Sequence, residues 1–138
     1  MTRIDFHTNV GDPLAYACRL ARKAYANGRA LVVLAEARRL AAFDEQLWTF
    51  ASLEFVPHCM AKSPLAQDTP VVLASNLGDA PHHQVLVNLG APVPAQFARF
   101  ERLIEIVGND EEELSAGRER FRFYRDRGYA IETHKQGA

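Results

Sequence analysis

The sequence predicts a single α/β domain in which a central, mostly parallel β-sheet lies between two layers of helices. Its 138 residues suit one domain, and contents of 48% hydrophobic and 24% charged residues are average for a globular protein. The N-terminal part shows strand-like and helix-like patterns in the order strand, helix, strand, which is the repeating unit of a parallel sheet. Short continuous apolar runs recur later in the chain and are typical of strands buried on both faces. Residues 1–138 are therefore expected to form one three-layer domain.

The N-terminal third carries the clearest of these patterns. Polar and apolar residues alternate at 3–6, which predicts a strand. A helix is expected over 13–27, because Asp12 is a suitable N-cap and the glycine at position 28 is a typical C-terminal stop. The apolar run ALVVLA at 30–35 then predicts a buried strand.

Beyond this point the predicted elements are less regularly spaced. Residues 36–48 predict a second helix, and residues 51–70, which have no clean period, predict a structured loop. The remaining predicted elements are a strand at 71–74, a strand at 85–89, a short helical turn running into a strand at 102–107, a helix over 110–127 capped by Asn109, and a strand at 129–133. The tail at 134–138 is expected to be frayed.

The chain lacks the motifs of several catalytic classes. The turn after the first predicted strand reads HTNVGDPLA and contains neither GxGxxG nor GxxxxGK[ST], so the fold is expected to resemble a nucleotide-binding domain without its phosphate loop. His82 and His83 are adjacent and would point apart in an extended segment, and no zinc-ligand spacing is present. Cys59 beside His58 is a poor nucleophile pair, since sequence neighbours rarely reach that geometry. We expect no cofactor, no metal and no catalytic residue.

Composition also limits the partners and the compartment. The formal net charge of −1 argues against a general nucleic-acid coat, so contact with nucleic acid is expected to be mainly indirect. The chain has no apolar run of about 18 residues and no signal-peptide pattern at its N-terminus, so no membrane association is expected. Two cysteines suit a reducing compartment, and a cytoplasmic location is expected.

The predicted helix over 110–127 has an unusual distribution of charge. Acidic residues open it and arginines close it, an arrangement that complements the helix dipole. Arg118, Arg122 and Arg125 are also spaced to share one face, with Phe121 at its edge. Guanidinium groups beside an aromatic ring suit a carboxylate attached to an apolar group. Single-stranded nucleic acid is an alternative ligand, but the acidic run on the same helix counts against it.

A second unusual feature is a concentration of large apolar residues after the second helix. The only tryptophan, Trp48, is followed at short intervals by Phe55, Pro57 and Met60. Trp48 can be interpreted as the last core residue of its helix. Apolar side chains clustered in irregular backbone also indicate a protein interface, and both interpretations remain open at this point.

These two regions resemble the chi subunit family of bacterial DNA polymerase III. The shared motifs are DEQLW followed by FVPH, at 44–48 and 55–58, and the pattern R-E-R-F-x-x-Y-R-x-x-G-Y at 118–129. The resemblance covers essentially the whole chain. It implies an α/β fold without a phosphate loop and a non-catalytic subunit that binds the psi subunit, which tethers it to the clamp loader. It also implies binding to the acidic C-terminal tail of single-stranded DNA-binding protein (SSB), which ends in a Phe carboxylate.

The resemblance assigns two groups of residues. The SSB-tail site would comprise Val107, Arg118, Phe121, Arg122 and Arg125. The psi site would comprise Trp48, Phe55, Pro57, His58 and Met60. Leu114 stands where the family can have a basic residue. Two other functions remain open: an enzyme that binds a small anion or nucleotide on a Rossmann-like fold, and direct binding of single-stranded DNA through the same arginines.

Overall fold

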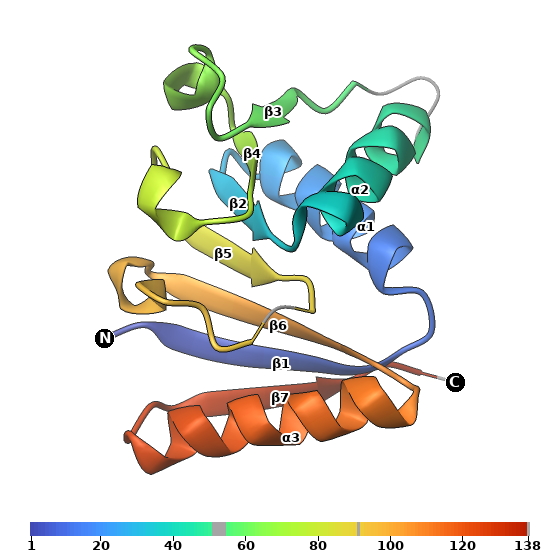
Figure 1. The fold of residues 1–138 in the computed structure, drawn as a ribbon, viewed down its shortest axis with the longest axis vertical. Coiled ribbons are helices and arrows are strands. Elements are labelled where there is room, and N and C mark those ends of the chain that lie inside the picture. The colour runs from blue at the N-terminus through green and yellow to red at the C-terminus, as the bar shows by residue number, and fades with distance from the viewer. Residues whose placement is uncertain (51–54, 91, 138) are drawn as a thin grey trace.

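The computed structural model describes residues 1–50, 55–90 and 92–137, with Phe50 described by its backbone alone. A seven-stranded sheet with the order β3-β4-β2-β5-β6-β1-β7 forms its centre (Figure 1). The strands are β1 (Arg3–Val10), β2 (Leu31–Leu34), β3 (His58–Met60), β4 (Val71–Ala74), β5 (Val85–Asn88), β6 (Arg102–Gly108) and β7 (Ile131–Lys135). All six neighbouring pairs among these described strands are parallel, so the α/β prediction is confirmed and the sheet is entirely, not mostly, parallel.

Helices cover the two faces of the sheet unequally. Helices α1 (Pro13–Ala26) and α2 (Ala37–Phe50) pack on one face, and α3 (Glu111–Asp126) packs on the other (Figure 1). Three short 3-10 turns, η1 (Ala66–Asp68), η2 (Leu77–Asp79) and η3 (Phe97–Arg99), each add a buried residue to the α3 side. The core therefore has two halves, one on each side of the sheet. Among the described helices, α1 and α2 cover one half, and α3 packs on the other.

Most predicted elements are confirmed to within a few residues. Helix α1 begins where Asp12 accepts a hydrogen bond from the amide of Ala15 at 3.2 Å, and it is followed by Gly28 at φ 70°. Helix α3 is also present, but its N-cap is Asp110 and not Asn109. The Asp110 carboxylate reaches the Glu113 amide at 2.7 Å, which places the first helical turn one residue later.

Two predictions were wrong because long-range pairing overrides weak local patterns. The predicted loop over 51–70 contains the strand β3, which pairs with β4 at the sheet edge, and the turn η1. The tail, predicted to be frayed from residue 134, continues as β7 through Lys135 beside β1. The amide of Gln136 then donates to the carbonyl of Thr8 at 2.9 Å, so the strand is held beyond its own last residue.

A buried polar cluster joins α3 to the sheet. The side chain of Glu105 on β6 is fully buried and accepts hydrogen bonds from three others. Arg120 Nε donates to Glu105 Oε1 at 2.8 Å, and the Tyr124 hydroxyl donates to Oε2 at 2.6 Å. The amide of Asn88 on β5 donates to both oxygens at 3.0 and 3.1 Å. Burial raises the pKa of Glu105, while its three donors act in the opposite direction.

A second polar cluster lies on the face of β1 that looks toward α1. Asp5 is buried and accepts a hydrogen bond from Arg102 Nε at 2.7 Å, while Arg3 Nε lies 3.5 Å from the same oxygen. His134 Nε2 lies 3.1 Å from the other oxygen of Asp5. Burial alone would raise the pKa of Asp5, but these hydrogen bonds and positive charges outweigh it and lower the pKa. His7, two residues along β1, contacts the Tyr16 hydroxyl.

The Glu105 cluster gives a first prediction about stability. We expect Glu105→Gln to lower the free energy of unfolding by roughly 3–5 kcal/mol, because the buried Arg120 charge loses its carboxylate. Tyr124→Phe removes one neutral donor and should cost only about 1–2 kcal/mol. Urea unfolding of both variants measures the difference. The double variant Glu105→Gln, Arg120→Leu should recover much of the loss, since no buried charge remains. Equal losses in the two single variants would contradict this account.

His7 gives a prediction about pH. Burial, followed by the charges of His134, Arg102 and Lys23, lowers the pKa of His7 from 6.5 to about 4. Between these values the unfolded chain binds more protons than the folded chain, so stability that is present above 6.5 is lost as the pH falls toward 4. His7→Asn removes this contribution. The difference in unfolding free energy between parent and variant should therefore shrink by roughly 2–3 kcal/mol on acidification, as urea unfolding at several pH values would show. If the difference in unfolding free energy between parent and variant stays constant with pH, His7 does not have the lowered pKa.

Candidate protein-binding surfaces

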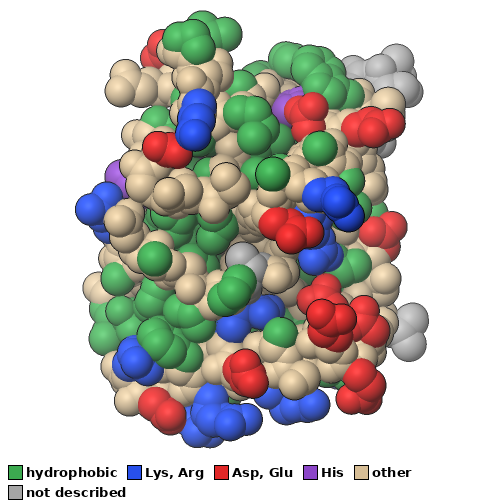
Figure 2. Space-filling view, in the orientation of Figure 1, with side chains coloured by type: hydrophobic (Ala, Val, Ile, Leu, Met, Phe, Trp, Pro, Cys, Tyr) green, Lys and Arg blue, Asp and Glu red, His purple; other side chains and the backbone are tan. Residues whose placement is uncertain are grey.

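Helix α3 has a buried face, which contacts the Glu105 cluster, and an exposed face on the opposite side. Gly117, Arg120 and Tyr124 are buried, at the spacing of one helical face. Arg118, Arg122 and Arg125 are exposed and form what we call the arginine face. Figure 2 shows acidic side chains gathered at the end of α3 that follows β6 and basic side chains along the rest of it. The predicted grouping of the three arginines is present in the structure.

The arginines of this face differ in their partners. Arg125 Nη2 lies 3.2 Å from Asp126 in an exposed ion pair. Within the described part of the chain, Arg118 and Arg122 have no hydrogen-bond or ion-pair partner. Their guanidinium groups are therefore available to an anionic ligand.

The two apolar residues assigned to the same site lie at different depths. Phe121 is half-buried at the edge of the arginine face and packs edge-on against Phe6 at 5.3 Å between ring centroids. Val107 is only 4% exposed and lies under the helix, where Gly117 permits a close approach. A Cβ atom at position 117 would come within 2.9 Å of Val107 Cγ1. Phe121 is thus the accessible apolar group, and it packs against the buried core cluster to which Val107 belongs.

The residues assigned to a psi contact surround the end of α2 and the edge strand β3. Trp48 is 57% exposed and Phe55 is 60% exposed, so Trp48 is not a core residue. Their rings lie 5.3 Å apart between centroids, and the imidazole of His58 lies 4.7 Å from the indole. We call Trp48, Phe55 and His58 the aromatic patch. Figure 2 shows hydrophobic side chains along this end of the molecule.

His58 fixes the patch to the body of the protein. Its side chain is 1% exposed, Nδ1 lies 2.7 Å from the carbonyl oxygen of Val56, and Nε2 lies 3.0 Å from Oδ1 of Asp44 on α2. Met60 stands two residues along β3 and is 46% exposed, and Pro57, which precedes His58 in the chain, is half-buried. The assigned residues are therefore neighbours on the surface, and His58 connects them without being exposed itself.

The places where a nucleotide phosphate would normally bind are occupied by acidic groups. The carboxylate of Asp12 caps the N-terminus of α1 and accepts a hydrogen bond from the amide of Ala15. A cavity of about 650 Å³ lies beyond the carboxyl ends of β2, β4 and β5, the usual ligand position in an open parallel sheet. Glu36, Glu112 and Arg39 line it, and Nη2 of Arg39 lies 3.6 Å from Oε1 of Glu113, so the one cation of the described lining already has an acidic partner. This cavity is a poor receptor for phosphate.

One group of side chains has the spacing of metal ligands. Asp5, Glu132 and His134 offer ligand atoms within 4.8 Å of one another, and no other such group occurs among residues 1–50, 55–90 and 92–137. Two arginines already contact Asp5, so the group is a charge-balanced ion-pair cluster and does not have the negative charge that a metal ion requires.

Two features were missed from the sequence. Arg120 was not separated from its neighbouring arginines, although Gly117 and Tyr124 share its helical face and indicate burial. The second is a cavity on the α1 side of the sheet, lined by cationic side chains from four separate segments. No local pattern indicates it, because only the strand order brings those segments together.

Comparison with known proteins shows the family to which this chain is similar. The family model described as "DNA polymerase III chi subunit, HolC" matches residues 1–132. Among curated relatives, the DNA polymerase III subunit chi of Pseudomonas aeruginosa is 34% identical, with 98% of this chain and 97% of that protein covered. The subunits chi of Haemophilus influenzae and Escherichia coli are 29% and 24% identical, over 88% and 84% of this chain and 85% and 80% of their own lengths. No helix in the described part of the chain is long and apolar enough to cross a membrane. The fold, the motifs and these matches together place the chain in the DNA polymerase III chi subunit family.

Proposed function

We propose that this chain is a non-catalytic linker within DNA polymerase III, with one surface for the SSB tail and another for psi. The chi family is a family of polymerase III subunits, so association with other components of that assembly follows from membership. The observation that carries the proposal is the arginine face of α3, whose Arg118 and Arg122 are exposed without partners in the described chain. A tail that ends in a Phe carboxylate and carries acidic residues complements such a face.

In the proposed contact, the arginines bind the charged groups of the tail, and Phe121 and Val107 bind its apolar side chain. Arg118 would hold the terminal carboxylate, because a guanidinium can bond both oxygens at once. The half-buried ring of Phe121 would pack against the Phe side chain of the tail, with Val107 beneath it. Arg122, one turn further along the exposed face, would pair with an acidic residue of the tail. Leu114 adds no charge, so the arginines would supply most of the electrostatic attraction.

The proposed psi contact rests on the exposure and rigidity of the aromatic patch. Exposed Trp and Phe rings that are already packed together lose little side-chain freedom on binding. Such residues are common among those that contribute most to interfaces. The patch belongs to the end of α2 and to β3, and is anchored through His58 to Asp44.

The two surfaces are far enough apart to be occupied together. The aromatic patch is beside β3 at one edge of the sheet, and α3 packs near β6 at the other side (Figure 1). Four strand spacings separate β3 from β6, against which α3 packs, which is about 19 Å. A ligand on α3 and a protein on the patch would therefore not compete for space.

We expect Arg118→Ala to weaken binding of an SSB-tail peptide roughly 10- to 100-fold, because a charge-assisted pair of hydrogen bonds is lost. Fluorescence titration with the tail peptide, and with a peptide lacking its terminal Phe, provides the measurement. Arg19→Ala is the matched control, since Arg19 is an exposed arginine on α1, on the opposite face of the sheet. Unchanged binding by Arg118→Ala would remove Arg118 from the site. Weak binding by the parent to both peptides would overturn the tail proposal itself.

We expect Trp48→Ala to weaken binding of psi by about 2–4 kcal/mol, because the exposed ring is lost from the centre of the patch. Binding of the tail peptide should stay unchanged. Leu65→Ala is a suitable control, because Leu65 is 66% exposed and lies outside the assigned residues. Surface immobilisation of psi and injection of each variant measures the effect. If Trp48→Ala behaves like Leu65→Ala, the psi surface lies elsewhere.

A further inference from the structure

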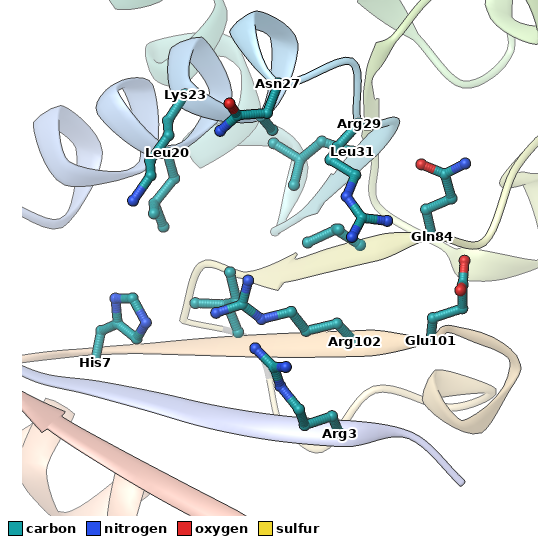
Figure 3. A pocket seen from close by; sticks show the side chains of 13 residues that line it. Arg3, His7, Leu20, Lys23, Asn27, Arg29, Leu31, Gln84, Glu101 and Arg102 are labelled. Carbon is teal, nitrogen blue, oxygen red and sulfur yellow. The ribbon is translucent and has the colours of Figure 1, made fainter.

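A basic cavity lies between α1 and the sheet, on the opposite face from α3. Its volume is about 550 Å³, within the usual range for small-molecule sites. Four cationic side chains line it: Arg3 on β1, Lys23 on α1, Arg29 before β2 and Arg102 on β6. Figure 3 shows their head groups turned into the space between α1 and the sheet. Neither the arginine face nor the aromatic patch contributes to this lining.

The cavity exists because of how the helices cover the sheet. Asp5 and His7 of β1, on the side toward α1, belong to neither apolar core cluster. The last turns of α1 form the opposite wall, through Lys23 and Asn27. The cavity between α1 and the strands β1 and β6 is therefore lined by these polar side chains together with apolar ones such as Leu20 and Ile104.

The positive charge of the lining exceeds its negative charge. Asp5 lies behind Arg3 and Arg102, and its hydrogen bond uses Nε of Arg102. The terminal nitrogens of that guanidinium make no hydrogen bond or ion pair with the described residues. Lys23 and Arg29 have no ion-pair partner within the described chain. Glu101 is the acidic residue of the lining, beside Gln84 in Figure 3.

Neutral groups in the same cavity are also oriented as donors. The side-chain oxygen of Gln84 accepts a hydrogen bond from the amide of Ala30 at 2.9 Å, so its NH₂ group remains available. Asn27 lines the opposite wall with a second amide. The one ring among the described lining residues is the imidazole of His7, which already packs against Tyr16 and His134, so a nucleobase would find little aromatic surface to stack on.

We propose that this cavity binds a polyphosphate chain, either a free inorganic polyphosphate or the phosphates of a nucleotide. Guanidinium and ammonium groups from separate segments can surround several phosphate oxygens at once. Because His7 supplies the only ring of this described lining, the phosphates are favoured over the base as the recognised part. The enclosing wall of α1 favours a compact anion over a nucleic-acid strand.

Calorimetric titration with sodium tripolyphosphate tests the proposal on the full chain. The parent should bind, and the double variant Lys23→Ala, Arg29→Ala should bind at least about tenfold more weakly. Arg19→Ala on the same helix should bind within about twofold of the parent, because Arg19 stacks on Tyr16 and is outside the cavity. Circular dichroism and SSB-tail binding of the double variant check that it is folded and that the α3 surface is intact.

Titration with a nucleoside triphosphate and with a single-stranded oligonucleotide identifies the source of the phosphates. Equal affinity for tripolyphosphate and for a nucleoside triphosphate supports recognition of the phosphate chain alone, and tighter binding of the triphosphate supports a nucleotide. The proposal is overturned if neither tripolyphosphate nor the nucleoside triphosphate binds at millimolar concentration, if the double variant binds them as well as the parent does, or if a single-stranded oligonucleotide binds and these two do not. These outcomes are independent of the tail and psi experiments, since the residues do not overlap.

Discussion

The hydrogen bonds that converge on Glu105 determine how α3 is placed, and the exposure of the arginine face depends on that placement. The fully buried carboxylate accepts hydrogen bonds from Arg120 and Tyr124 of α3 and from Asn88 of β5. These contacts fix the rotation of the helix about its axis, because Arg120 and Tyr124 lie on one side of it. The arginines at 118, 122 and 125 must then face outward. An apolar contact alone would position the helix with less directional precision.

Unequal helix coverage explains where the remaining surfaces occur. The α3 side is closed by the helix and by three short 3-10 turns, so little of the sheet is left open there. On the other side α1 and α2 cover the strands around β2, and the polar residues of β1 face a cavity. The charged lining of that cavity follows from this incomplete coverage. An apolar strand face that no helix covers would be exposed to water, so polar and charged side chains occupy it instead.

Much of the fold could be predicted from local sequence signals, and the failures have physical causes. The caps at Asp12 and Gly28 and the apolar run at 71–74 act within a few residues of themselves. By contrast, β3 and the end of β7 depend on pairing with β4 and β1, which no local pattern reports. The arginine face followed from helical spacing alone. The role of Arg120 and the basic cavity required knowledge of which distant segments meet.

The uneven charge of α3 also has a kinetic consequence. Its first turn carries three glutamates and its later turns carry the exposed arginines, so the helix presents a negative end and a positive end to solvent. An acidic ligand approaching through water is repelled by the first and attracted by the second, which orients it before any contact forms. Added salt screens this field over distances of about 10 Å, so ionic strength acts chiefly on the rate of encounter and much less on the lifetime of the complex.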